Sequence, residues 1–422
     1  MLQTYPEPVN AAATGVQRTY LSLTVLNTLA ASFIWGVNTL FLLDAGLNNT
    51  EAFTANAAFT LGMVLFEIPT GVVADTRGRR FSFLLGTLTL LTSTLLYWWM
   101  WFTRAPFAGW VLASVLIGLG FTFFSGATEA WLVDALADAG EAGSLEAVFG
   151  RAQVATGVAM LVGAVLGGVI AQASDLGLPY LIRSAVLVLS TVVAWLFMHD
   201  RGFTPDRSAR PGKAIRAVVA GSIENGLRNA PVRWLMLASP FTAGVGVYVF
   251  YALQPYLLGL AGDPKAYGIA GAAAALSAGA QIVGGLLVSR IRHLFRRRTD
   301  AVLLGTVVGV ALLAGLGFAP NLWVALVLVA VWSFVWAMVT PLRQSFLNGV
   351  IPSAQRATVL SFDSLMGSAG GVVVQPALGR VADVAGYATS YLVTAGIQAL
   401  ALPFVWLARR ERAASDPIEA AR

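Results

Sequence analysis

The feature that most constrains the fold is a succession of apolar segments, each about as long as a lipid bilayer is thick. Of the 422 residues, 57% are hydrophobic and only 11% are charged, and the mean hydropathy is +0.73. A transmembrane helix takes about 20 apolar residues. The segments lack the period-two alternation of a membrane β-barrel, so we predict an all-α membrane protein with twelve transmembrane helices. The predicted spans lie at roughly residues 20–43, 52–75, 81–103, 107–135, 147–171, 178–198, 233–259, 266–289, 300–319, 322–347, 357–381 and 388–408.

The basic residues predict the orientation of the chain, because cytoplasmic loops carry an excess of Lys and Arg. With both termini cytoplasmic, most of the 27 Lys and Arg fall on the cytoplasmic side, and Arg104, Lys265 and Arg380 fall outside. Residues 1–19 lack the basic start and apolar core of a cleavable signal peptide. Few lysines and many arginines, alanines and glycines favour a GC-rich bacterial genome. We therefore expect a multi-pass protein of the bacterial inner membrane with both termini in the cytoplasm.

A long polar interval from His199 to about Val232 divides the chain into halves of six predicted spans each. We predict an N-terminal six-helix bundle in residues 1–198, a cytoplasmic linker in 199–232, and a C-terminal six-helix bundle with a short tail in 233–422. Residues 214–228 could form an amphipathic helix on the membrane surface, although a plain linker is the simpler interpretation.

Composition argues against an enzyme, a metalloprotein and an ATP-driven pump. The chain has no cysteine, and its two histidines, His199 and His293, fall in predicted loops. No phosphate-binding G-x-x-x-x-G-K-[ST] loop is present. We therefore expect no cofactor and no metal, and no nucleic-acid partner, since the basic runs are explained by membrane topology.

The two halves look like weak copies of one another. Residues 67–71 align with residues 281–285 at an offset of 214, and residues 163–168 align with residues 375–380 at an offset of 212. Two parallel six-helix repeats are an arrangement found in secondary transporters.

The turn between the second and third spans carries the most specific motif. Residues 71–80 match the pattern G-x-x-x-D-x-x-G-R-[RK], with Asp75, Gly78, Arg79 and Arg80 at its key positions. This turn resembles the signature loop between helices 2 and 3 of the major facilitator superfamily (MFS). The resemblance covers about residues 18–410, and it implies the twelve-helix MFS fold and transport by alternating access.

The resemblance also implies a gate around this loop. Asp75 would lie near the N-terminal end of helix 11, where the helix dipole favours an acid. Arg79 would pair with an acidic residue at the cytoplasmic end of helix 4, and Asp134 occupies that place. Gly71, one turn before Asp75, would allow another helix to approach closely. The plainer alternative is that these charges only anchor the membrane topology.

Ionisable residues inside a bilayer are costly and suggest function. The proton-coupling candidates are Glu67, Glu129, Arg343 and Asp363. Glu129 and Arg343 occupy equivalent positions in the two repeats, so they could face each other across a central cavity and separate when Glu129 is protonated. Alternatively Glu67 is structural, Glu129 and Arg343 extend to the interface, and Asp363 is a helix-terminal acid. Arg183, about five residues inside the sixth span, is expected to extend to the outer surface in the same way.

In the family, helices 1, 4, 7 and 10 line the cavity. Aromatic walls with few fixed charges suit apolar or cationic amphipathic molecules, although such residues are also common at lipid-facing positions. The substrate-cavity candidates are Asn27, Trp35, Asn38, Tyr248, Tyr251, Gln254, Trp332 and Trp336.

Two sequence details bear on a resemblance to bacterial drug–proton antiporters. Their fifth helix carries G-P-x-x-G-G, and here Gly157 precedes Gly163, Gly167 and Gly168, with Ala164 in place of the proline. Those antiporters also carry an arginine in helix 4, and residues 114–118 contain none. The glycines also fit simple close helix packing.

We predict a monomeric, proton-coupled transporter that exports amphipathic or drug-like small molecules across the inner membrane, with protons and membrane lipids as its other partners. One alternative is a dedicated transporter, for uptake or export, of a single metabolite, siderophore or lipid. A non-transporting membrane receptor is a further alternative, although the short loops leave no room for added domains.

Overall fold

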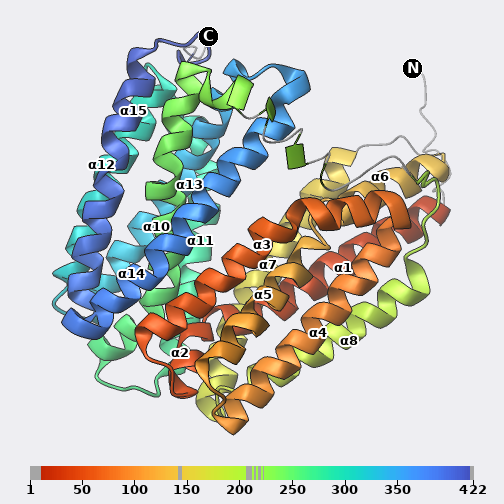
Figure 1. The fold of residues 1–422 in the computed structure, drawn as a ribbon, viewed down its shortest axis with the longest axis horizontal. Coiled ribbons are helices and arrows are strands. Elements are labelled where there is room, and N and C mark those ends of the chain that lie inside the picture. The colour runs from red at the N-terminus through yellow and green to blue at the C-terminus, as the bar shows by residue number, and fades with distance from the viewer. Residues whose placement is uncertain are drawn as a thin grey trace, which may run out of the picture.

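The computed structural model describes residues 11–140, 145–205, 212, 215–216, 220–221 and 223–418, and helices make up most of it (Figure 1). No β-strand occurs in these ranges, only an isolated bridge between Arg297 and Pro417. The N-terminal half contains α1 (Ala11–Trp35), α2 (Asn38–Asp44), α3 (Asn49–Arg77), α4 (Arg79–Thr103), α5 (Phe107–Thr122), α6 (Ala127–Asp138), α7 (Leu145–Ala173) and α8 (Leu178–Phe197). The C-terminal half contains α10 (Ala230–Ala261), α11 (Tyr267–Ile291), α12 (Arg298–Gly317), α13 (Leu322–Val350), α14 (Arg356–Ala399) and α15 (Ala401–Arg410), with short helical turns η1 (Ile223–Leu227), η2 (Arg292–Leu294) and η3 (Ser353–Gln355).

The described residues contain ten helices long and apolar enough to cross a membrane, or eleven if the bent pair α1 and α2 forms one span. The last of them, Thr358–Arg410, is 53 residues long. At 1.5 Å per residue this is about 80 Å, far more than a bilayer. Gly386 interrupts it with a φ of 81°. The segment is long enough for two crossings, and the count of twelve spans stays a prediction.

Figure 1 shows α1–α8 on one side of the molecule and α10–α15 on the other. We call the end that carries Arg77–Arg80 and Arg409–Arg412 the basic end, and the end that carries Arg104 and Gly386 the far end. The two groups of helices converge at the far end and diverge toward the basic end (Figure 1). The predicted domain boundaries at 198 and 233 stay predictions. Of the proposed amphipathic segment 214–228, residues 214, 217–219 and 222 lie outside the described residues, and Ile223–Leu227 forms the short helical turn η1.

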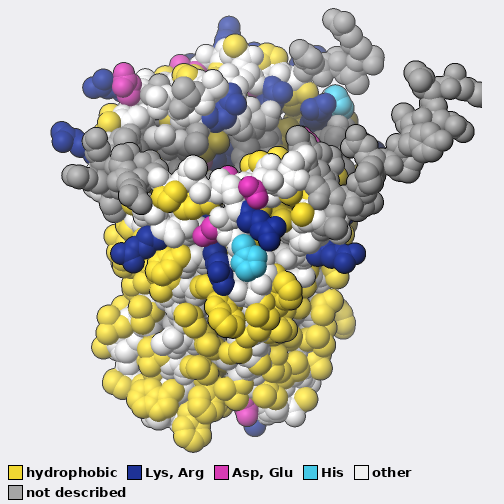
Figure 2. Space-filling model, turned by 90° about the vertical axis from the view of Figure 1, so that its right-hand side faces the viewer, with side chains coloured by type: hydrophobic (Ala, Val, Ile, Leu, Met, Phe, Trp, Pro, Cys, Tyr) yellow, Lys and Arg dark blue, Asp and Glu magenta, His cyan; other side chains and the backbone are white. Residues whose placement is uncertain are grey.

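The outer surface of the bundle is apolar, as a lipid-facing surface must be. Exposed large side chains such as Trp99, Trp195, Leu286, Trp323 and Val373 point away from the core. In Figure 2 hydrophobic side chains cover the lower part of the visible face, and Lys and Arg gather in its upper part, toward the basic end. This distribution fits a chain that crosses a membrane many times.

Two predicted spans are broken by glycine. The first span bends by 48° between α1 and α2, at Gly36 and Val37. The fourth span divides into α5 and α6 at Gly126, whose φ is 69°. Because a left-handed conformation is accessible to glycine without steric cost, Gly126 lets the chain change direction there. The break places Glu129 in the first turn of a new helix.

The halves pack most closely at the far end, where glycines bring backbones together. A Cβ added to Gly36 of the N-terminal half or to Gly168 of α7 would lie 3.0 Å from the Cα of Gly271 in α11. Small residues at such crossings let helices approach until their backbones touch. The far end is therefore a tight joint between the halves.

Hydrogen bonds also close this joint. Gln254 of α10 reaches into the bend of the first span, where its Oε1 accepts from the Thr39 amide at 2.8 Å and its Nε2 donates to the Trp35 carbonyl at 2.6 Å. Asp383 of α14 accepts from the amides of Asn49 and Thr50 at 2.9 and 2.8 Å. A carboxylate is stabilised at this place because α3 begins at Asn49 and directs its free N–H groups and the positive end of its dipole outward.

Candidate functional site

The signature loop adopts a shape that only glycine permits at its centre. Gly78 has φ 110° and ψ 151°, and a Cβ there would collide with Asp200. Asp200 accepts a hydrogen bond from the Arg80 amide at 2.9 Å, and Arg80 itself donates to the Trp195 carbonyl at 2.5 Å. The loop is thus tied to the segment that follows α8.

Burial raises the pKa of Asp200, although the amide and the charge of Arg80 act in the opposite direction. A carboxylate with a raised pKa is penalised in its charged form, so its ionisation costs stability as the pH rises through that pKa. Asp200 therefore serves here as an acceptor for the Arg80 amide, at the N-terminus of α4, rather than as a stabilising charge.

Arg79 gathers two acids at the basic end. Its guanidinium lies 2.5 Å from Asp75 Oδ1 and 4.0 Å from Asp134 Oδ2, and it also stacks over the ring of Phe203 at 5.6 Å. The predicted neighbours Arg79 and Asp134 are therefore brought together, but the short contact is made to Asp75 on α3. Nothing lies within 4 Å of the position that a Cβ on Gly71 would occupy, so the close helix approach expected there is not seen in this conformation.

The two predicted glutamates lie apart from the C-terminal half. Glu67 is partly buried in α3 and accepts a hydrogen bond from the Ser125 hydroxyl at 2.6 Å. Glu129 is exposed at the start of α6, within electrostatic range of Tyr20. Neither is paired with Arg343 in this structure, so the expected contact between Glu129 and Arg343 is not seen.

Arg343 instead forms an ion pair inside the C-terminal half. Its two terminal nitrogens donate to the carboxylate oxygens of Asp363 at 2.7 and 2.6 Å, which is a bidentate pair between α13 and α14. Ser239 of α10 completes the group, because its Oγ accepts from Arg343 at 2.6 Å and donates to Asp363 at 2.7 Å. The side chains of Arg343 and Asp363 are 21% and 10% exposed, so the pair is largely shielded from water.

This ion pair belongs to the wall of a cavity of about 500 Å³, which we call the C-half pocket. It lies among α10, α12, α13, α14 and α15. Trp332 and Trp336 stack in it with ring centroids 5.6 Å apart. Gln398 also lines it, 4% exposed, and its Oε1 has no hydrogen-bond partner. Other lining residues include Thr242, Val247, Thr306, Val335, Val339, Gln344, Leu347, Asn348, Leu360 and Ser364. A pocket with apolar walls and a few polar groups suits a small molecule of amphipathic character.

The other predicted cavity residues make internal contacts. Asn27 accepts from Ser190, and Asn38 bonds both Asn56 and Tyr180. Tyr248 is fully buried against Phe53, with its hydroxyl bonded to Ser390.

Trp35 and Gln254 belong to the far-end joint, and Tyr251 is partly exposed on α10. In this conformation, then, only Trp332 and Trp336 of the predicted set line the C-half pocket.

The glycines of α7 serve helix contacts. A Cβ on Gly163 or Gly167 would collide with Ser32 or Phe33 of α1, and one on Gly168 would collide with α11. Gly157 is different, because a Cβ there would make an ordinary contact of 3.6 Å with Ile282. Three of the four predicted positions therefore require glycine for packing.

Sequence reasoning assigned Arg183 to the membrane surface, and this was wrong, because the side chain is 1% exposed and turned into the bundle. It also missed Asp383, Ser239 and Gln398. A polar residue in the middle of an apolar span was the available signal for Ser239 and Gln398. The described residues contain no group of His, Cys, Asp or Glu that could hold a metal ion.

Comparison with known proteins places these features in context. Residues 20–373 match the family model of the Major Facilitator Superfamily. An uncharacterized MFS-type transporter of Methanocaldococcus jannaschii is 21% identical over 230 residues, which are 54% of this chain and 57% of that relative. The match thus spans little more than half of the relative.

Solved structures share the fold over nearly the whole chain. The nucleoside transporter NupG superposes with a TM-score of 0.74 at 11% identity, over 94% of this chain and 99% of that one. A bacterial homolog of the human lysosomal transporter Spinster, in an inward-facing and occupied conformation, gives 0.73 at 16% identity, over 97% and 99%. A D-xylose–proton symporter gives 0.67 at 16% identity, over 93% and 96%.

Proposed function

This chain belongs to the major facilitator superfamily, and from that premise we propose that it is a proton-coupled secondary transporter that exports amphipathic small molecules by alternating access. We place it in the bacterial inner membrane, as a monomer with both termini and the basic end in the cytoplasm. The observation that carries the proposal is the Arg343–Asp363 ion pair in the wall of the C-half pocket.

A largely buried ion pair is costly to form, because both charges lose their hydration. Ionisable residues at membrane depth are therefore candidates for a functional role, such as proton binding. Asp363 can accept a proton, whereas Arg343 stays charged at any physiological pH. In this proposal the pair has two states, one with Asp363 ionised and one with Asp363 protonated.

Protonation of Asp363 would remove the counter-charge of Arg343. The guanidinium would then be left with Ser239 and the Leu235 carbonyl as acceptors, which are neutral groups. Since α10, α13 and α14 all contribute to this group, its loosening changes the contacts among three helices that surround the pocket. Proton binding and pocket shape are coupled in this way.

The signature loop would supply the second part of the mechanism. We propose that Asp75, Arg79 and Asp134 form a latch that meets the start of α14 when the basic end closes. In the present conformation Arg79 pairs closely with Asp75 and lies 4.0 Å from Asp134, both within its own half. Glu67 and Glu129 remain secondary proton candidates on the N-terminal side.

The wall of the C-half pocket suggests the substrate class. The stacked indoles of Trp332 and Trp336 offer a flat apolar surface, which suits an aromatic or otherwise planar body. A dedicated transporter of one metabolite is the alternative, and nucleosides and D-xylose are named for two transporters of the same fold.

The test uses inside-out membrane vesicles that are energised with a proton gradient and loaded with a pH-sensitive dye. A panel of cationic, neutral and anionic amphipathic compounds is added to vesicles with the wild type or with Asp363→Asn, Glu67→Gln or Glu129→Gln. The matched control is Asp300→Asn, which removes the acid of another C-terminal ion pair, Asp300–Arg409 at 2.5 Å, away from the C-half pocket.

Compound-evoked proton release that Asp363→Asn abolishes and Asp300→Asn preserves is the expected result. A response to a single metabolite would replace the broad exporter with the dedicated transporter. No response from folded wild-type protein to any compound would refute proton-coupled export.

A further inference from the structure

Arg183 of α8 is a buried cation that has no acidic partner among the residues that the structure describes. Its Nε donates to Thr94 Oγ1 at 3.0 Å and its Nη1 donates to the Ala30 carbonyl at 3.1 Å, so α4 and α1 hold it from two sides. Its third nitrogen, Nη2, is buried and makes no hydrogen bond. The acceptors that it does have are neutral, and its side chain is 1% exposed.

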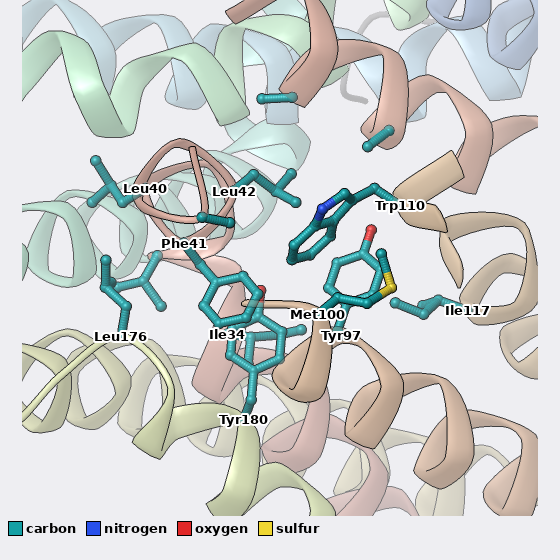
Figure 3. Close-up of a cluster of buried hydrophobic side chains, with 14 of the residues drawn as sticks. Ile34, Leu40, Phe41, Leu42, Tyr97, Met100, Trp110, Ile117, Leu176 and Tyr180 are labelled. Atoms are coloured by element: carbon teal, nitrogen blue, oxygen red, sulfur yellow. The ribbon is translucent and has the colours of Figure 1, made fainter. Parts of the chain in front are cut away.

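The groups around Arg183 are aromatic rather than acidic. Its guanidinium stands 5.7 Å from the ring centroid of Phe121 in α5. The phenol groups within electrostatic range belong to Tyr97, Tyr180 and Tyr251. Tyr97 and Tyr180 are committed elsewhere, because the first bonds Ser114 and the second donates to Asn38. Figure 3 shows both rings near Phe41 in a densely packed core, with the centroids of the two tyrosine rings 6.2 Å apart.

Tyr251 is the exception among these neighbours, because it comes from α10 of the opposite half and is partly exposed. Arg183 therefore faces the seam between the halves through one tyrosine. Any movement of the halves that opens the far end also moves Tyr251 relative to Arg183. The proposed alternating access requires such a movement.

A buried guanidinium with a free N–H has one strong preference, which is an anion that accepts hydrogen bonds from it. We propose that Arg183 binds a carboxylate carried by the transported molecule, which makes amphipathic carboxylates the preferred substrates. The inference rests on the proposed function and gives its substrate class. The aromatic body of such a molecule lies against Phe121, and its carboxylate accepts hydrogen bonds from Nη2 of Arg183.

The test measures binding without a proton gradient, so that its outcome is separate from proton coupling. The purified protein is placed in nanodiscs of phosphatidylcholine, whose headgroups carry no net charge. Equilibrium binding of 2-naphthoate and of its neutral isostere 2-naphthamide is measured for the wild type, Arg183→Gln, Arg183→Lys and Arg104→Gln. Arg104 is the matched control, because it is an exposed arginine at the far end that pairs with Asp44. Binding is repeated over a range of sodium chloride concentrations.

We expect the wild type and Arg104→Gln to bind 2-naphthoate at least about tenfold more tightly than 2-naphthamide, since hydrogen bonds to charged groups are the stronger ones. Arg183→Gln should bind the two compounds equally, and Arg183→Lys should retain part of the preference. Equal or absent binding of the two compounds by the wild type overturns the inference, whether or not the variants fold. Retention of the preference in Arg183→Gln overturns it as well.

Varying the chloride concentration distinguishes a chloride ion from a substrate carboxylate as the anion at Arg183. If chloride alone occupied Arg183, raising the chloride concentration would change the binding of 2-naphthamide and 2-naphthoate alike, and the carboxylate assignment would fail. Competition between chloride and 2-naphthoate only, abolished in Arg183→Gln, supports it. Proton release evoked by neutral or cationic compounds, together with no preference for 2-naphthoate, would retain the proposed function and reject this substrate class.

Discussion

Single residues determine the shape of the signature loop, and Gly78 is the clearest case. We expect Gly78→Ala to lower the free energy of unfolding by about 1–3 kcal/mol, because alanine is strained at a φ of 110° and its Cβ would collide with Asp200. Thermal unfolding in nanodiscs measures this. Gly279→Ala in α11 is the control, since its Cβ meets open space; a helix-interior alanine there should be neutral or stabilising. Equal effects of the two substitutions would contradict the prediction.

The Arg343–Asp363 pair makes a second prediction at this scale. Removing either partner leaves the other charge buried and alone, which typically costs about 3–5 kcal/mol. We expect Asp363→Asn and Arg343→Gln each to lower the melting temperature strongly, and the double variant to recover much of the loss. A double-mutant cycle of thermal unfolding measures the coupling. Strictly additive losses would mean that the pair contributes no mutual stabilisation.

Individual residues also show where sequence reasoning stops. The family pattern placed Arg79 next to Asp134, and the two lie 4.0 Å apart. It could not place Arg343 beside Asp363, because that contact depends on the rotation of α13 relative to α14. For Arg183 the sequence indicated a position near the end of a span, from which an extended side chain reaches water. The side chain instead turns inward, because Thr94 of α4 and the Ala30 carbonyl of α1 accept its hydrogen bonds. The positions of these neighbouring helices could not be read from the sequence.

At the scale of elements, Asp383 of α14 ties the N-terminus of α3 into the far-end joint. Asn in place of Asp383 removes a negative charge from the N-terminus of α3 and one of two acceptor oxygens, which costs about 1 kcal/mol. We therefore expect Asp383→Asn to shift the ratio of closed to open far ends about fivefold. Spin labels at Ala108→Cys and Val384→Cys report the far-end distance, because both positions are exposed and the chain has no other cysteine. An unchanged distance distribution would mean that Asp383 does not stabilise the closed far end.

Helix α7 makes a matched pair of predictions through its glycines. We expect Gly168→Ala to destabilise the closed far end by about 1–3 kcal/mol, because the new Cβ would press on the backbone of α11 and overpacking has costs of this size. Gly157→Ala should have little effect, since its Cβ meets only Ile282 at 3.6 Å. The same pair of spin labels distinguishes them. A similar response of both variants would mean that the glycines act through helix flexibility and not through contact.

Helix boundaries were the most predictable part of the chain, because bilayer thickness and hydropathy restrict them strongly. The predicted span 52–75 lies within α3, and the predicted span 322–347 lies within α13. The breaks at Gly36 and Gly126 were not predicted, since glycine is common in membrane helices and carries no sign of which copies will bend. The break near Gly36 gives Gln254 its acceptor at the Trp35 carbonyl, and the break at Gly126 starts α6 close to Glu129.

For the whole molecule, the geometry describes two halves that close at one end and diverge at the other (Figure 1). The far end is held by close backbone contacts at glycines, by apolar packing between the halves and by hydrogen bonds. The basic end is held within each half, by Arg79 on one side and by Arg343 on the other. In the proposed alternating access, contacts between the halves break at the far end and form at the basic end, while the packing inside each half is retained.

This exchange leads to a prediction for transport as a whole. A cross-link across the far end, made by oxidising Thr50→Cys with Asp383→Cys, should stop transport while leaving the C-half pocket able to bind from the basic end. The two native side chains are hydrogen-bonded in the closed joint, so their replacements lie near one another there. Compound-evoked proton release should disappear on oxidation. A reductant should restore it to the level that remains when Asp383 is replaced by cysteine without a cross-link. Thr50→Cys alone is the control for oxidation. Transport that continues in the cross-linked protein would mean that the far end need not open, and alternating access of the two halves would then be wrong for this chain.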